Sequence, residues 1–239
     1  MLKFLLSLFI VLTSQANIYQ FRPTGEHVAT YNFSESSAPP GGLFFNGHLF
    51  VVGNNNGDLT YVRLVGDSAY VVEHVSTGMS SINGLADFNT FVIAIGSTGM
   101  SAGNQVVRMQ ADGTTVESNP SAGIWRGATT DGTFFYPLVV GATTSFTFQA
   151  KPDSPTTTVS TIRVNTTSEY DIGHNSRDFL LLTDTGPVEG YSIHRPDGSI
   201  VMQNDISSIV TGRCRGITTN RYWENGELQP GRDIFVLCG

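Results

Sequence analysis

The chain has 239 residues, of which 40% are hydrophobic and 14% are charged, and its 13 basic residues are outnumbered by 20 acidic ones. The resulting net charge of −7 argues against nucleic acid or an anionic membrane surface as the main partner. A chain of this length forms either one large all-β domain or two small ones.

The first predicted element is a secretory leader at residues 1–16. It carries one cation, Lys3, followed by an apolar run from Phe4 to Leu12 and a small-residue ending, Ser14-Gln15-Ala16. This pattern is typical of a signal peptide, here cleaved before Asn17, and the run is too short to span a bilayer. The alternative is a buried N-terminal strand. No later run in the sequence is long and apolar enough to cross a membrane, so we expect an extracellular protein.

The elements after the leader repeat. Ile18–Gly25 (IYQFRPTG) resembles Gly190–Gly198 (GYSIHRPDG). Two markers recur at intervals in the forties. A glycine precedes each expected inner strand, at Gly42, Gly84, Gly127, Gly173 and Gly216. An aromatic or apolar residue begins each expected third strand, at Tyr19, Tyr61, Val107, Phe146 and Tyr191. This period is typical of the four-stranded blade of a β-propeller, and both markers indicate five units.

Within each unit the pattern distinguishes the strands. Short, almost continuous apolar runs such as Phe91–Gly96 and Phe179–Asp184 predict second strands that are buried on both faces. Third strands alternate instead and most run into a Gly or Asp turn, as at Asp197-Gly198. No segment after the leader has helical apolar spacing, so we expect almost no helix.

The repeat is also split between the two ends of the chain. The C-terminal Ile234–Gly239 reads as a second strand, whereas the chain after the leader begins with a third strand and a fourth one, Glu26–Phe33. The sequence therefore predicts an all-β, five-bladed β-propeller in which N-terminal strands pair with C-terminal strands to complete the last blade. A β-sandwich or a β-trefoil would also contain short strands, but neither explains the period or the split unit.

The predicted fold is a single domain at residues 17–239. Its blades cover about 41–76, 82–118, 123–164, 170–206, and 213–239 together with 17–33.

The two cysteines, Cys214 and Cys238, lie at the predicted closure. An even pair in an exported protein predicts one disulfide, with two buried free thiols as the alternative. An Asn225-Gly226 turn leaves the two residues one position out of line, so the pairing requires a bulge or a longer loop. Asn32 and Asn165 begin N-glycosylation sequons, which matter only in a eukaryotic source.

Candidate binding residues lie beside the inner-strand glycines. Arg126 and Arg215 occur in matching contexts, RGATTDG and RGITTNR, Asn83 precedes another of these glycines, and His174 follows one. We expect these four side chains to converge on the channel mouth and to bind an anionic or hydroxyl-rich ligand, since guanidinium groups suit carboxylate or sulfate. The alternative is that they pair with Asp171 and Glu169 or line a water-filled channel.

Aromatic residues supply a second kind of candidate. Trp223 lies in the polar segment WENGELQPG and is expected to be exposed and able to stack on a sugar ring. Trp125 precedes Arg126 and is at least as well explained by packing between blades.

Catalytic and metal motifs are weak. Asp87, Asp131 and Asp178 could serve a glycosidase, but each falls where the first hairpin of its blade should turn. Gly53–Leu59 (GNNNGDL) lacks the spacing of a calcium loop, and no serine triad is evident. We therefore expect no metal and no cofactor.

These features favour a secreted, monomeric binding or interaction module that recognises a glycan or an extracellular protein through its rim or channel. The alternatives are a small extracellular hydrolase that uses channel carboxylates and a structural matrix or coat component. The sequence signatures of WD40 and kelch repeats are absent.

Overall fold

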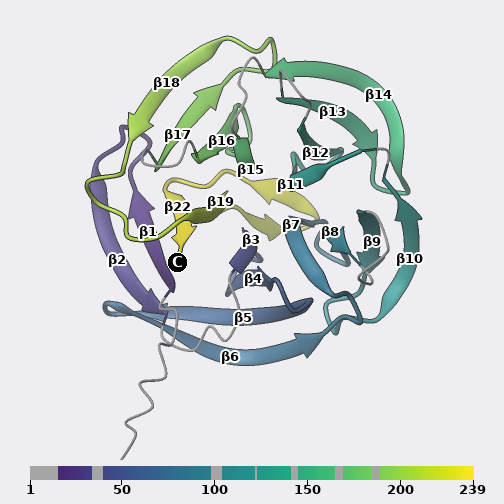
Figure 1. Cartoon of the computed structure of the whole chain (residues 1–239), viewed down its shortest axis with the longest axis horizontal. Coiled ribbons are helices and arrows are strands. Elements are labelled where there is room, and N and C mark those ends of the chain that lie inside the picture. Colours follow the sequence, from purple (N-terminus) through teal and green to yellow (C-terminus); the bar gives the residue numbers. More distant parts are fainter. Residues whose placement is uncertain are drawn as a thin grey trace, which may run out of the picture.

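The chain forms a wheel of antiparallel sheets around a central axis (Figure 1). The structure is a computed structural model that describes residues 16–33, 40–97, 104–121, 123–140, 145–164, 169–184 and 189–239. Within these ranges the chain contains 22 strands and no helix, and none of it is a helix able to span a membrane. The predicted all-β, five-bladed propeller is confirmed.

Each blade contains four strands that run from the axis to the rim. Blade 1 consists of β3 (Pro40–Phe45), β4 (Phe50–Asn54), β5 (Asp58–Val65) and β6 (Ser68–Ser76), and blade 2 of β7 (Ser81–Asp87), β8 (Val92–Ser97), β9 (Gln105–Met109) and β10 (Thr115–Pro120). Blade 3 consists of β11 (Trp125–Thr130), β12 (Phe135–Val140), β13 (Ser145–Lys151) and β14 (Ser154–Val164), and blade 4 of β15 (Glu169–His174), β16 (Phe179–Asp184), β17 (Glu189–His194) and β18 (Ile200–Asp205).

Blade 5 is assembled from both ends of the chain. Its inner strands are β19 (Cys214–Thr219) and β22 (Ile234–Cys238), and its outer strands are β1 (Ala16–Phe21) and β2 (His27–Phe33). β1 pairs with β22 in antiparallel register from Asn17 opposite Cys238 to Phe21 opposite Ile234. The predicted closure is therefore present. The predicted leader lies outside the described residues except for Ala16, which is buried at the start of β1.

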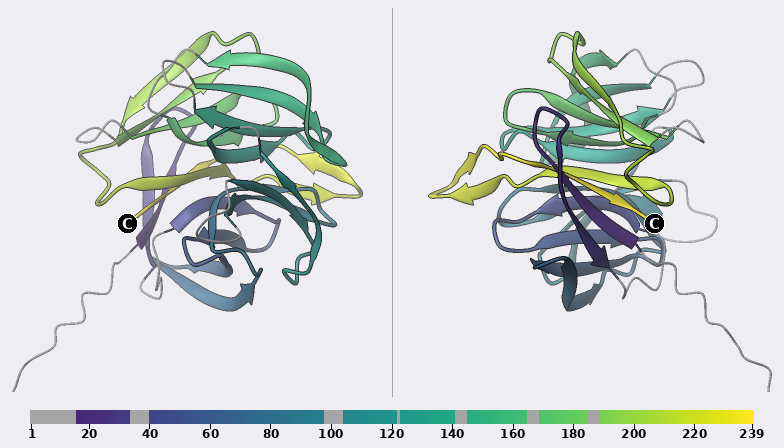
Figure 2. Two further views of the ribbon diagram at one scale, coloured as in Figure 1. Left: turned by 45° about the vertical axis from the view of Figure 1, so that its right-hand side comes forward. Right: turned by 90° about the vertical axis from the view of Figure 1, so that its left-hand side faces the viewer.

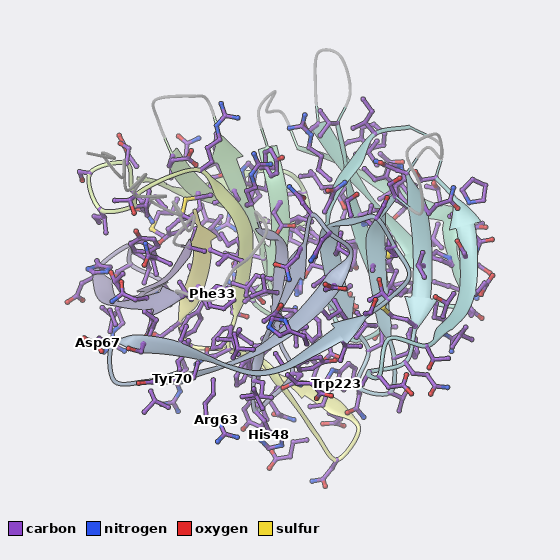
Figure 3. The ribbon with its side chains drawn as sticks, turned by 60° about the horizontal axis from the view of Figure 1, so that its bottom comes forward. Phe33, His48, Arg63, Asp67, Tyr70 and Trp223 are labelled. Carbon is purple, nitrogen blue, oxygen red and sulfur yellow. A yellow bond between two sulfur atoms is a disulfide. The ribbon has the colours of Figure 1, made fainter. Side chains whose placement is uncertain are left out.

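A further contact joins blade 5 to blade 1 at the rim. Asn32 of β2 pairs in parallel with Ser68 of β6, and the Asn32 amide donates to the Asp67 carbonyl at 2.9 Å. The two blades thus form one sheet of eight strands. Figure 3 labels Phe33 and Asp67 at this seam. The sequon residue Asn32 is exposed here, whereas Asn165 lies outside the described residues.

The hydrophobic core lies between neighbouring blades. Second strands such as β4 and β22 are buried along their whole length, as their apolar runs predict. Between blades 4 and 5, for example, Phe21 packs on Tyr191 with ring centroids 5.7 Å apart. Each blade therefore buries one face against each neighbour.

The inner strands share one irregularity. In each of them the pairing with the second strand shifts by one residue, which marks a β-bulge. The bulged residues are Gly41, Asn83, Arg126, Tyr170 and Arg215. The residues that follow the bulges are Gly42, Gly84, Gly127, Asp171 and Gly216. We call these last five the axial ring. The expected equivalence of Gly173 with the other glycines is thus wrong, because Asp171 occupies that position in blade 4.

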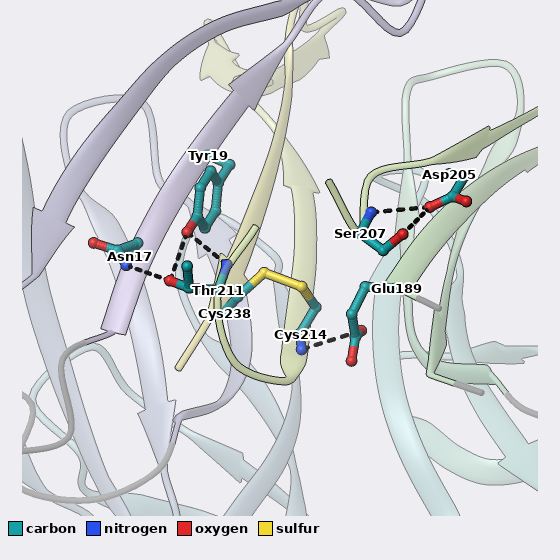
Figure 4. The surroundings of a disulfide bond; sticks show 8 residues. All are labelled: Asn17, Tyr19, Glu189, Asp205, Ser207, Thr211, Cys214 and Cys238. Atoms are coloured by element: carbon teal, nitrogen blue, oxygen red, sulfur yellow. Dashed lines mark hydrogen bonds between the residues drawn. A yellow bond between two sulfur atoms is a disulfide. The ribbon is translucent and has the colours of Figure 1, made fainter. Parts of the chain in front are cut away.

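The predicted disulfide is present between Cys214 and Cys238, whose Cα atoms are 3.9 Å apart. The bulge at Arg215 brings the two residues opposite each other, which meets the requirement noted in the sequence. Nearby, the Cys214 amide donates to Glu189 Oε2 at 3.3 Å, and Tyr19 of β1 bonds Thr211 (Figure 4). The disulfide thus lies where blades 4 and 5 meet the end of the chain.

Candidate functional site

The two ends of the channel differ. We call the end that carries the bulges and Cys214–Cys238 the disulfide face, and the end where the inner strands finish the hairpin face. The latter carries β20 (Tyr222–Glu224) and β21 (Glu227–Gln229), an insertion between the inner two strands of blade 5. Figure 2 shows this hairpin projecting from the wheel on the side away from the C-terminus.

The channel between these ends is almost closed. A Cβ atom added to Gly84 would lie 2.6 Å from backbone atoms of Gly127 and Ala128, and one on Gly42 would lie 3.1 Å from Gly84 Cα. Glycine is required here because the inner strands approach backbone to backbone. The cavity that remains inside the axis has a volume of about 20 Å³, which is room for about one water molecule. This cavity therefore does not admit a larger ligand.

Asp171 is the one side chain in the axial ring. It is 1% exposed, its Oδ2 accepts a hydrogen bond from the Ile217 amide at 2.9 Å, and a Cβ atom on Gly127 would lie 2.3 Å from its Oδ1. Burial raises the pKa of this carboxyl well above its usual value, although the amides of Ile217, Ile172 and Ala128 oppose the shift. Asp171 thus fills the axis and ties blade 4 to blade 5.

On the disulfide face two arginines meet on one aromatic ring. The guanidinium carbons of Arg126 and Arg215 lie 5.0 Å and 4.5 Å from the Tyr170 ring centroid, and Arg215 Nη1 also donates to the Tyr170 hydroxyl. These three residues occupy the bulge positions of blades 3, 5 and 4. We call them the arginine clamp. Asn83 occupies the equivalent position in blade 2.

The clamp concentrates positive charge. Partial burial lowers the pKa of Arg215, and the nearby positive charge of Arg126 lowers it further. Two guanidinium groups held on one ring present several donors to a single anionic group.

On the hairpin face the β20–β21 hairpin covers the channel mouth. The Trp223 indole donates to Asp87 Oδ2 of blade 2 at 3.1 Å, and buried Arg221 donates to the Thr130 carbonyl of blade 3 at 2.6 Å. The same guanidinium lies 3.3 Å from His174 Nδ1 of blade 4. The hairpin of blade 5 is therefore anchored across the axis on three other blades.

The predicted binding residues are thus divided between the two ends. Arg126, Arg215 and Asn83 lie at the disulfide face, whereas His174 and Trp223 lie at the hairpin face. These two groups of residues lie at opposite ends of the channel, because His174 is at the end of its inner strand whereas the bulges are near the beginning of the inner strands. Trp223 is half-buried rather than exposed, and Trp125 is 2% exposed and packs on Phe148.

Two of the three predicted acidic candidates, Asp131 and Asp87, hold hydrogen bonds of the fold. Asp131 Oδ1 accepts from the amides of Thr133 and Phe134, and its Oδ2 accepts from the Tyr136 hydroxyl at 2.7 Å, as in a turn. Burial raises the pKa of Asp87 to about 6, although the Trp223 indole opposes this. In the described part of the chain, no three Asp, Glu, His or Cys side chains are grouped to hold a metal ion.

Sequence reasoning missed Tyr170 and the axial position of Asp171, which it named only as an alternative partner of the arginines, and it also missed Arg221. A signal for the first two was present: Ile172 aligns with Ile217 as the apolar residue after the axial ring, which places Tyr170 beside Arg215 in register. Arg221 follows the inner strand of blade 5, and nothing in its local sequence indicates that it is buried. Its burial depends on the other blades.

Comparison with known proteins identifies a fold and not a family. No protein-family model and no curated protein matches the chain. Among solved structures, Myxococcus xanthus glutaminyl cyclase is similar with a TM-score of 0.61 at 14% identity, over 93% of this chain and 95% of that chain. A putative TolB from Agrobacterium tumefaciens matches with a TM-score of 0.54 at 9% identity, over 94% of this chain and 98% of that chain. A chain of a nidogen/laminin complex matches with a TM-score of 0.53 at 11% identity, over 85% and 82%. At these identities the likeness extends to the propeller fold alone.

Proposed function

We propose that the chain is a secreted, monomeric binding module that recognises an acidic glycan through the arginine clamp on its disulfide face. The observation that carries the proposal is the convergence of Arg126 and Arg215 on Tyr170. Carboxylate or sulfate groups fit such paired guanidinium forks. Because the protein as a whole carries a charge of −7, an acidic ligand needs a local cationic site rather than general attraction.

Two features support export. The leader pattern at residues 1–16 is that of a signal peptide, and cleavage before Asn17 would keep Asn17–Phe21 of β1 paired with β22. The Cys214–Cys238 disulfide also suits an oxidising compartment. The nearly closed channel directs the proposal to the faces of the wheel rather than to its axis.

The test is binding of the mature chain to an array that contains sulfated, uronate-bearing and neutral glycans. We expect binding to acidic glycans that weakens as salt increases, and at least about a tenfold loss in the Arg126→Gln/Arg215→Gln double variant. Arg63→Gln is the matched control, because Arg63 is an exposed arginine on β5, away from the bulge positions (Figure 3).

Three results would count against this function. One is no binding to any acidic glycan, the second is equal weakening by the Arg63→Gln control, and the third is retention of binding by the double variant. If the mature chain instead binds an acidic extracellular protein and no glycan, that protein is the partner of the arginine clamp.

A further inference from the structure

A groove of about 540 Å³ lies between blades 3 and 4 on the hairpin face. Its lining includes Tyr136, Gln149 and Ser160 of blade 3, His174 and Phe179 of blade 4, and Asp131 of the first turn of blade 3. The volume falls within the usual range of small-molecule sites, and the groove is separate from the arginine clamp at the other end of the axis.

The aromatic side of this groove is rigid. Tyr136 and His174 are each 5% exposed, and their rings lie parallel with centroids 6.1 Å apart. Phe179 meets both rings edge-on at 5.0 Å. Because three packed rings from two blades fix one another, their orientation does not depend on a ligand.

The hydrogen bonds of His174 determine which ring nitrogen carries its proton. The Ser176 amide donates to Nδ1 at 3.1 Å, and the Arg221 guanidinium lies 3.3 Å from the same atom. Both are groups that only donate, so Nδ1 accepts and the proton is on Nε2. Burial, followed by the charge of Arg221, lowers the pKa of His174 to about 3. The ring is therefore neutral, with Nε2–H as a donor.

The polar side is a chain of hydrogen bonds with one direction. The Ser160 hydroxyl donates to Gln149 Oε1 at 3.1 Å, the Gln149 amide donates to the Tyr136 hydroxyl at 3.1 Å, and that hydroxyl donates to Asp131 Oδ2 at 2.7 Å. An ionised carboxylate only accepts, so it sets the direction of every bond before it. The groove thus offers prearranged donors and acceptors at fixed positions.

The charges of the groove balance. Asp131 contributes one negative charge and Arg177, which also lines the groove, contributes one positive charge. We propose that this groove is a second binding site, which takes a neutral, hydroxyl-rich ring such as one monosaccharide unit. The hydroxyl groups of the sugar bond the Gln149 amide and the His174 Nε2–H, and the buried, mutually packed rings of Tyr136, His174 and Phe179 keep the wall of the site in place.

The test is titration of the isotope-labelled mature chain with the methyl glycosides of glucose, galactose and mannose, followed by NMR. With at least one of the three we expect saturable shifts of the Gln149 side-chain amide, the His174 ring and the Ser176 amide. Gln149→Leu should weaken binding at least about tenfold, because it removes the middle of the hydrogen-bond chain.

Gln20→Leu is the matched control. Gln20 occupies the equivalent third-strand position in blade 5, where its amide donates to Asp233 Oδ2 at 2.6 Å and accepts from the Tyr31 hydroxyl at 2.7 Å. Gln20→Leu removes the same kind of amide hydrogen bonds away from the groove, so it should leave glycoside binding unchanged. If Gln149→Leu does not fold, Tyr136→Phe replaces it, since it keeps the ring and removes only the hydroxyl.

The proposal is overturned if none of the three glycosides gives saturable shifts, if the shifts lie outside the groove, or if the control weakens binding as much as the groove variant. The Arg126→Gln/Arg215→Gln variant should retain glycoside binding in the groove. Failure of the arginine clamp and failure of the groove are therefore distinguishable.

Discussion

At the residue scale, His174 and Asp87 respond to pH in opposite directions. Burial lowers the pKa of His174 to about 3, so the unfolded chain takes up this proton first as the pH falls below about 6.5, and stability is lost toward pH 3. Burial raises the pKa of Asp87 to about 6, so its contribution is present below about pH 4 and is lost as the pH rises through 6. Between about pH 4 and 6 the two partly cancel.

This opposition predicts two contrasting variants. The difference in the free energy of unfolding between the wild type and His174→Gln (wild type minus variant) should increase with pH between about 4 and 6. The corresponding difference between the wild type and Asp87→Asn should decrease over the same range. Each slope approaches one proton, or about 1.4 kcal/mol per pH unit. Urea unfolding at several pH values measures both. Slopes of the same sign for both variants would contradict the assignment.

The individual binding residues could be predicted only in part. Arg126 and Arg215 were found because their sequence contexts match, and the bulge in each strand gives them equivalent positions. The sequence pattern aligns Gly173 with the axial glycines of the other blades and therefore predicts His174 at the same end. Asp171, which holds that place, carries no glycine signal, since its carboxylate fills space that the other blades leave to hydrogen atoms. The sequence pattern alone therefore does not predict that an aspartate replaces the axial glycine in blade 4.

At the element scale, the β20–β21 hairpin is short and depends on its anchors. It consists of two strands of three residues each, too few to be stable alone. Arg221 precedes it, and burial lowers the pKa of this guanidinium to about 10, while Asp131 and Asp87 favour the charged form. The hairpin stays across the channel because side chains from other blades hold it.

Arg221→Met therefore tests the hairpin. The Thr130 carbonyl would lose its donor, so we expect a loss of about 2 kcal/mol in the free energy of unfolding. Hydrogen exchange at Trp223 and Leu228 should become faster as the hairpin loosens. Arg232→Met, at an exposed arginine near the same hairpin, should change neither quantity. Equal exchange in both variants would show that the hairpin does not depend on this anchor.

The strand types and the hairpin turn at Asn225-Gly226 were predicted, whereas the anchoring of the hairpin on other blades was not. Second strands such as β8 and β16 could be recognised because burial on both faces requires continuous apolar residues. The segment WENGELQPG is polar, which suggested an exposed Trp223. In the structure the indole is half-buried because Asp87 of another blade accepts its hydrogen bond. That partner is distant in sequence, so local polarity does not reveal it.

At the scale of the whole molecule, ring closure relies on three links. β1 pairs with β22, β2 pairs with β6, and Cys214 is bonded to Cys238 across 24 residues of sequence. The split repeat predicted the first link and the cysteine positions predicted the third. The second depends on how a turn at Asp67 meets the end of β2, which no repeat pattern encodes.

Removal of the disulfide tests how much this link contributes to the stability of the closed ring. Cys214→Ala/Cys238→Ala should lower the free energy of unfolding by about 3 kcal/mol, because the unfolded chain regains the entropy of a closed loop. The blade should still form through β1 and β22, with unchanged far-ultraviolet circular dichroism. Wild type in reductant should match the variant. Free thiols in the oxidised wild type, or a change below about 1 kcal/mol, would contradict this account.

The closure also delays the pairing of β1 during synthesis. β1 and β2 are synthesised before the four complete blades, whereas β22, the partner of β1, follows them. Until then the inner edge of β1 has unpaired amides and carbonyls, a ready template for wrong pairing with another nascent chain. Joining β1 to β22 pairs residues that are more than 200 positions apart in the sequence, so we expect this long-range contact to form late in folding.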